Sequence, residues 1–78
     1  MVINTQLQKH IAEYFKKEIS EINFNSSKDN IGEWDSLEHL RLILSIEDSF
    51  KVKFPLDVIP LMSSFKIIQE ELGKRKNE

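Results

Sequence analysis

The apolar residues near the N-terminus follow a helical period that fails after residue 19. Four large apolar residues recur there at every fourth position: Leu7, Ile11, Phe15 and Ile19. This spacing places them on one face of a helix. Thr5 and Gln8 have the spacing of a capping box, which is typical of a helix start. The pattern predicts an amphipathic helix over residues 5–19.

Residues 20–33 follow no regular period. Polar and turn-forming residues fill the segment: Asn23, Asn25, Ser26, Ser27, Asp29, Asn30 and Gly32. A loop of this length is uncommon in so small a domain, and such loops are usually functional or held by inward-pointing side chains. Ile22, Phe24 and Ile31 are its apolar residues, so we expect these three to anchor the loop to the core.

A second helical pattern begins at Asp35 and ends near Phe50. Asp35 and Glu38 have the spacing of a capping pair, and an acidic first turn suits the positive end of the helix dipole. Leu37 and Leu44 lie beside its predicted inward face. That face is expected to contain Leu40, Ile43, Ile46 or Glu47, and Phe50.

The C-terminal third predicts a short helix followed by a longer one. The short helix covers residues 56–59 and is cut by Pro60, because proline lacks the N–H group that a helix interior requires. Ser63 or Ser64 can cap the last helix, and Gly73 is expected to end it. Its expected inward residues are Phe65, Ile68 and Leu72.

Composition agrees with an all-α fold of three main helices and one short helix. A chain of 78 residues has room for one small domain, residues 1–78. Its 40% hydrophobic and 31% charged residues are ordinary for a globular domain. Two Gly and two Pro are too few for a turn-rich all-β chain. The sequence therefore predicts a four-helix bundle.

Charge and cysteine content exclude several classes of function. A net charge of −2 gives no basic surface for nucleic acid, which disfavours a DNA-binding helix-turn-helix. The basic run Lys74-Arg75-Lys76 is expected to be a frayed tail. The absence of Cys excludes disulfides, thiolate metal sites and a cysteine nucleophile.

No apolar run is long enough to span a membrane, and no leader is visible, so we expect a cytoplasmic protein.

Ser36 is the residue at which the pattern permits chemistry. On spacing alone it is a capping or first-turn serine of the second helix. His39 follows three residues later, but no oxyanion hole or nucleophile elbow accompanies the pair. We therefore expect no catalytic residue and, with two His and no Cys, no metal site. A phosphate on Ser36 would lie beside free N–H groups at the helix start, where the helix dipole stabilises an anion.

The run Ile31-Gly32-Glu33-Trp34-Asp35-Ser36-Leu37 and the segment Ile46-Glu47-Asp48-Ser49-Phe50 resemble the acyl carrier protein family. The likeness spans nearly the whole chain, including Phe54-Pro55, Asp57 and the Ser-Ser-Phe start of the last helix. It implies a four-helix bundle of acyl-carrier-protein type. It also implies that a phosphopantetheinyl transferase attaches 4'-phosphopantetheine from coenzyme A to Ser36.

The same resemblance implies a carrier and not an enzyme: a monomer that holds acyl groups as thioesters. Its partners would be the transferase and the enzymes that load or transfer acyl or aminoacyl groups. Asp35 would cap the helix and help the transferase bind. Leu37 and Leu44 would be exposed contacts for partners, with core packing as the alternative. The charged partner-binding residues would be Glu38, Arg41, Glu47 and Asp48, with a solvated helix face as the alternative for the acids.

Trp34 and Arg41 depart from the carriers of bulk fatty-acid synthesis, which usually have a small residue before Asp-Ser-Leu and a more acidic helix. The Trp-Asp-Ser-Leu-x-His pattern resembles specialised carriers of polyketide, modified-sugar or surface-polysaccharide pathways. We interpret Trp34 as an apolar lid that pins the loop to the core, with partner recognition as the alternative. An aminoacyl or D-alanyl carrier and an unmodified helical interaction module remain alternative functions; the motif of peptidyl carriers is absent.

Overall fold

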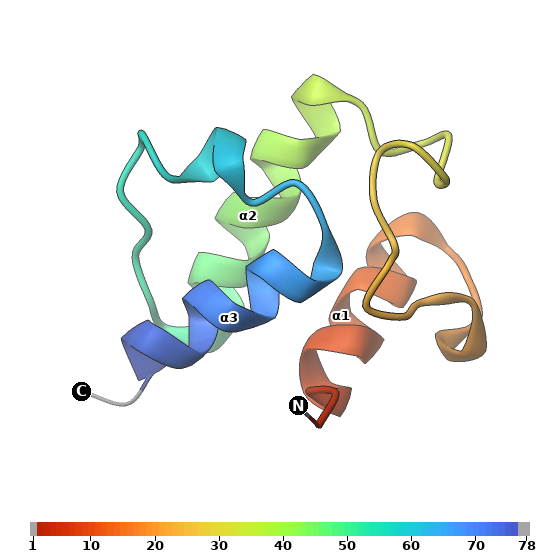
Figure 1. The fold of residues 1–78 in the computed structure, drawn as a ribbon, viewed down its shortest axis with the longest axis horizontal. Coiled ribbons are helices and arrows are strands. Elements are labelled where there is room, and N and C mark those ends of the chain that lie inside the picture. The colour runs from red at the N-terminus through yellow and green to blue at the C-terminus, as the bar shows by residue number, and fades with distance from the viewer. Residues whose placement is uncertain (1, 77–78) are drawn as a thin grey trace.

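A computed structural model describes residues 2–76, and the side chains of residues 2–75. The chain forms three α-helices: α1 (Thr5–Phe15), α2 (Ser36–Phe50) and α3 (Phe65–Lys76). Two short 3-10 helices lie in the connections: η1 (Ile19–Glu21) and η2 (Ile59–Leu61). The described residues contain no β-strand, so the all-α class is confirmed. In Figure 1 the long loop after α1 and the connection from α2 to α3 lie on opposite sides of the molecule.

One hydrophobic core joins the three helices and the long loop. The largest side chains with almost no exposure come from every part of the chain: Leu7, Ile11, Ile22, Trp34, Leu42, Ile43, Ile46, Met62, Phe65, Ile68 and Leu72. Full burial of such a side chain contributes roughly 1.5–3 kcal/mol. In the loop, Ile22 and Ile31 are buried and Phe24 packs against the core. The prediction that these three residues anchor the loop is confirmed.

The cap of α1 lies one residue earlier than the sequence pattern indicates. Asn4 is the N-cap, and its side-chain oxygen accepts a hydrogen bond from the Leu7 N–H at 3.0 Å. Asparagine is among the strongest N-cap residues because its short side chain reaches the free amides of the first turn. The predicted capping box at Thr5 and Gln8 is therefore wrong.

The end of α1 also differs from the prediction, which extended the helix to residue 19. Lys16 adopts a left-handed conformation with φ 58°, and its N–H bonds to carbonyls of the last turn. The chain therefore leaves the helix after Phe15, and Ile19 is 47% exposed within η1. The side-chain amide of Gln8 donates to the carbonyls of Ile19 and Ile22, which holds the turn against α1.

Three expectations for the C-terminal third are wrong. Residues 56–58 form a turn that leads into η2, which begins at Ile59. Pro60 lies inside η2 and does not cut it, because the start of a helix leaves its N–H groups unbonded in any case. α3 continues through Gly73, which has no positive φ. The basic run is also ordered as far as it is described: Arg75 pairs with Glu71 at 2.7 Å.

The N-terminus of α3 is held by the long loop. The backbone N–H of Phe65 donates to the Ser26 carbonyl at 2.8 Å, and that of Lys66 donates to the Phe24 carbonyl at 3.3 Å. The predicted Ser64 cap is present as a longer contact, 3.4 Å from the Ile67 N–H to the hydroxyl oxygen. These bonds satisfy amides that a helix start otherwise leaves free.

His10 links α1 to α2 and gives the fold a pH dependence. Its Nε2 lies 2.8 Å from the Ser45 hydroxyl, which itself donates to the Leu42 carbonyl, so Nε2 carries the proton and donates. Partial burial lowers the pKa of His10 below its ordinary 6.5, against a smaller opposing effect of Glu13. The unfolded chain therefore binds this proton more readily than the folded chain, and stability is lost as the pH falls below 6.5.

We expect the free energy of unfolding, measured by urea denaturation, to decrease between pH 7.5 and 5.5. His10→Gln keeps a donor for Ser45 but cannot titrate, so the decrease should become smaller in this variant. An unchanged pH dependence in His10→Gln would assign the effect to other groups.

Candidate functional site

Ser36 is the first residue of α2, and its side chain is exposed. Asp35 is the N-cap, and its Oδ1 accepts a hydrogen bond from the Glu38 N–H at 2.8 Å. Within residues 2–76 the Ser36 hydroxyl makes no hydrogen bond, and the N–H groups of Ser36 and Leu37 also donate to no protein group. The site therefore presents a free hydroxyl beside two free amides at the positive end of a helix.

Of the two hydrogen bonds in the capping pair predicted at the start of α2, only the one accepted by the Asp35 side chain is formed. Asp35 caps the helix, but its own N–H donates to the Glu33 carbonyl and not to Glu38. The Glu38 carboxylate instead accepts the Tyr14 phenol at 2.7 Å and pairs with Arg41 at 3.3 Å. Partial burial and this bond to Glu38 raise the pKa of Tyr14. Glu38 thus fastens α2 to α1 instead of presenting a free charge.

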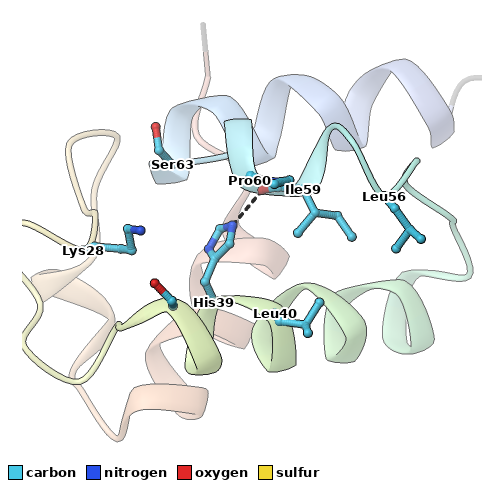
Figure 2. A pocket seen from close by; sticks show the side chains of 8 residues that line it. Lys28, His39, Leu40, Leu56, Ile59, Pro60 and Ser63 are labelled. Carbon is cyan, nitrogen blue, oxygen red and sulfur yellow. Dashed lines mark hydrogen bonds between the residues drawn. The ribbon is translucent and has the colours of Figure 1, made fainter.

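A groove of about 310 Å³ lies next to Ser36, between α2 and the segment that ends in η2. Its lining is mostly apolar and consists of Lys28, Ser36, His39, Leu40, Leu56, Ile59, Pro60 and Ser63. Figure 2 shows Leu40 and Leu56 facing one another across it, and the Lys28 side chain pointing toward it from the long loop. The groove is at the small end of the range of roughly 300–1,000 Å³ that is common for small-molecule sites.

His39 forms part of the wall of this groove and is buried, not solvated as a lone histidine usually is. The Trp34 indole N–H donates to its Nδ1 at 2.9 Å, and its Nε2 lies 2.8 Å from the Ile59 carbonyl. Because Nδ1 accepts, Nε2 carries the proton and donates to Ile59, as the dashed line in Figure 2 marks. Both ring nitrogens are engaged within the fold, so His39 is not placed to act as a base for Ser36.

The Trp34 side chain is buried beside two other rings. Its ring stacks on Phe15, with centroids 5.4 Å apart, and its N–H edge meets His39, whose ring is inclined to it by only 19°. The indole is only 1% exposed. Trp34 is therefore the predicted lid that pins the loop to the core, and it has no surface left for direct partner recognition.

Neither a protein-family model nor a curated protein matches this chain. Within the described residues, no group of three or more potential metal ligands comes together. No helix in residues 2–76 is both long and apolar enough to cross a membrane.

The leucines of α2 divide between the core and the surface. Leu37 is 56% exposed and Leu44 is 50% exposed, so core packing is excluded for both. Leu40, which was expected to face inward, is 42% exposed. The buried residues of α2 are His39, Leu42, Ile43, Ile46 and Glu47. The predicted inward positions of Ile43 and of Ile46 or Glu47 are therefore confirmed, and that of Leu40 is wrong. Leu40 was misplaced because leucine is apolar whether it lies in the core or on the surface.

Glu47 requires a correction, because its proposed place on an acidic surface is contradicted by its burial. It is 8% exposed, and its Oε2 accepts the Phe54 backbone N–H at 2.8 Å. Asp48 is exposed and keeps its predicted place on the surface, and Arg41 is exposed while paired with Glu38. The sequence pattern did not associate five residues of the groove with Ser36, because they are distant from it in sequence and only the fold brings them there: Lys28, Leu56, Ile59, Pro60 and Ser63.

Proposed function

We propose that this chain is an acyl carrier protein that holds acyl groups as thioesters on a 4'-phosphopantetheine arm attached to Ser36. The observation that carries the proposal is the Ser36 hydroxyl, which is exposed and unbonded within the described residues at the first position of a capped helix. The residues beside it are compatible with the arm. Free amides suit the phosphodiester, and the adjoining groove offers apolar walls and the Lys28 ammonium.

In the attachment step the Ser36 Oγ attacks the β-phosphate of coenzyme A. A bond forms between Oγ and phosphorus, the pyrophosphate P–O bond breaks, and the nucleotide bisphosphate leaves. The hydroxyl proton passes to a base of the transferase, since His39 is engaged by Trp34 and Ile59. When bound, the arm supplies a terminal thiol that carries the acyl group as a thioester. The chain itself positions Ser36 and presents it to its partners.

The fold supports the same proposal at the level of architecture. In a bundle of acyl-carrier-protein type, α1, α2 and α3 would be the main helices, and η2 would occupy the place of the short helix. We assign the carrier to a specialised polyketide, modified-sugar or surface-polysaccharide pathway in the cytoplasm, where it would act as a monomer. An aminoacyl or D-alanyl carrier is the alternative within the same chemistry, and the small groove favours an exposed cargo.

The test is to incubate the protein with coenzyme A, Mg²⁺ and a broad-specificity phosphopantetheinyl transferase and to measure the intact mass. We expect the mass to increase by one phosphopantetheinyl group in the wild type and in Ser49→Ala, which alters another exposed serine of α2. Ser36→Ala should gain nothing while its circular dichroism stays that of the wild type. A wild-type mass that does not change would favour an unmodified interaction module. Loading assays with adenylating and acyl-transferring enzymes then separate aminoacyl from acyl cargo.

A further inference from the structure

The tip of the long loop is a hydrogen-bonded turn that places Lys28 at the groove of Ser36. The Ser27 N–H donates to the Asn30 side-chain oxygen at 3.0 Å, and the Asn30 N–H donates to the Ser27 carbonyl at 3.2 Å. Ser27 also forms an isolated β-bridge with Ser64, directly before α3. The flexible stem of the Lys28 side chain therefore starts from a backbone that is fixed on both sides.

The Lys28 ammonium is an uncommitted cation. The side chain is exposed, and it has no hydrogen bond or ion pair with any residue in the described part of the chain. Figure 2 shows it pointing toward the groove from the long loop. Among the described residues that line the groove it is the one charged side chain, since Trp34 and Ile59 engage His39 as a neutral ring. Lysine commonly binds phosphate as a compact point charge, so the groove offers one such charge next to Ser36.

The other charges near Ser36 make this cation important once a phosphodiester is attached. The Asp35 carboxylate is exposed, accepts the Glu38 N–H and forms no ion pair among residues 2–75. A phosphodiester on Ser36 would place a second negative charge beside it, and like charges repel unless a cation lies between or beside them. Asp29, the neighbour of Lys28, borders a different hollow that does not include Ser36. Lys28 is therefore the group placed to offset the added charge.

We propose that Lys28 binds the phosphodiester that modification places on Ser36, and that this ion pair fastens the tip of the long loop to the start of α2. The inference rests on the proposed function, because the unmodified chain has no phosphodiester. The loop tip would open less often in the modified protein than in the unmodified one. Because both groups are exposed, salt should weaken the pair: the Debye length shortens from about 10 Å at 0.1 M to about 3 Å at 1 M.

The experiment compares amide hydrogen exchange of the full chain before and after modification by coenzyme A and a broad-specificity phosphopantetheinyl transferase, with complete modification verified by intact mass. The Asn30 and Ile31 N–H groups report on the loop tip, because both donate to the Ser27 carbonyl. We expect these two amides to exchange about threefold more slowly after modification, a factor that corresponds to about 0.7 kcal/mol and is usual for an exposed ion pair. The slowing should be present at about 0.1 M NaCl and largely lost at about 1 M.

Three variants assign the slowing to Lys28. Lys28→Gln should abolish it, because glutamine carries no charge, and Lys28→Arg should keep it, because arginine is also a cation that binds phosphate. Lys66→Gln is the matched control and should keep it as well. Lys66 is exposed and borders the adjoining hollow together with Lys28, but it does not line the groove of Ser36. Both lysines are exposed, so the unmodified variants should keep the circular dichroism of the wild type.

The phosphorus NMR resonance of the modified protein gives a readout that a purely structural role of Lys28 would not move. The phosphodiester resonance should differ between the wild type and Lys28→Gln at about 0.1 M NaCl, and the two should nearly coincide at about 1 M. Lys66→Gln should give the wild-type resonance at both salt concentrations. This measurement observes the phosphate directly, so it separates an ion pair at Ser36 from a general change in the loop.

Two outcomes would overturn the inference, and intact mass distinguishes them. If the wild-type protein gains the phosphopantetheinyl group but Lys28→Gln shows the same slowing of the Asn30 and Ile31 amides, or the wild type shows none, then Lys28 does not bind the phosphodiester and the proposed function still stands. If the wild-type mass does not change, the proposed function fails, and the ion pair that rests on it fails as well.

Discussion

Trp34→Ala is expected to lower the free energy of unfolding by about 3–5 kcal/mol, the usual cost of truncating a large buried aromatic side chain. The indole is 1% exposed, stacks on Phe15 and donates its N–H to His39. Its removal would leave a cavity where the long loop meets α1 and α2. A 78-residue domain has a total stability of about 4–12 kcal/mol at the common 0.05–0.15 kcal/mol per residue. The substitution should therefore remove a large share of it.

Urea denaturation followed by circular dichroism measures this loss, because the variant has no tryptophan to report by fluorescence. Trp34→Phe keeps an aromatic ring and should cost less than Trp34→Ala. Leu37→Ala, at an exposed position of α2, should change stability by about 0.5 kcal/mol or less. If Trp34→Ala were no more harmful than Leu37→Ala, the loop would not be fastened by this side chain.

His39→Phe is the second substitution with a large expected effect. Phenylalanine fills similar space but leaves the Trp34 indole N–H and the Ile59 carbonyl without their partner. Each buried polar group left unpaired costs about 1–3 kcal/mol, so we expect a total loss of about 2–6 kcal/mol for the two groups. The loss should be accompanied by movement of η2, because the Ile59 carbonyl is the point at which His39 holds that segment.

A double-mutant cycle separates the two hydrogen bonds of His39. In a Trp34→Phe background the indole N–H is already absent, so His39→Phe should cost about 1 kcal/mol less than in the wild type. His39→Gln provides both a donor and an acceptor and should cost less than His39→Phe. Strictly additive losses in the cycle would contradict a direct bond between Trp34 and His39.

The sequence pattern predicted the helices where local rules decide them. The start of α2 followed from the capping side chain of Asp35, whose bond to the Glu38 N–H spans only three residues. The loop anchors followed from the isolated apolar residues in a polar segment. The end of α1 did not follow, because the left-handed turn at Lys16 has no glycine to mark it.

The candidate site was predictable only in part. The exposed Ser36 at a helix start was identified from a motif, and the structure places it so. The bonds of His39 to Ile59 and of Glu47 to Phe54 were missed, because each joins residues that only the folded chain brings together. A buried histidine and a buried carboxylate look the same in sequence as solvated ones. For that reason the acidic surface of α2 was overestimated.

The bonds from the Phe65 and Lys66 amides to carbonyls of the long loop bear on how the chain folds. The first turn of α3 has its donors satisfied only after the loop has closed over it, and the partners come from opposite halves of the chain. Contacts between distant parts of a chain must overcome the entropy of closing the intervening segment. We therefore expect fraying at the start of α3 and opening of the loop to be coupled.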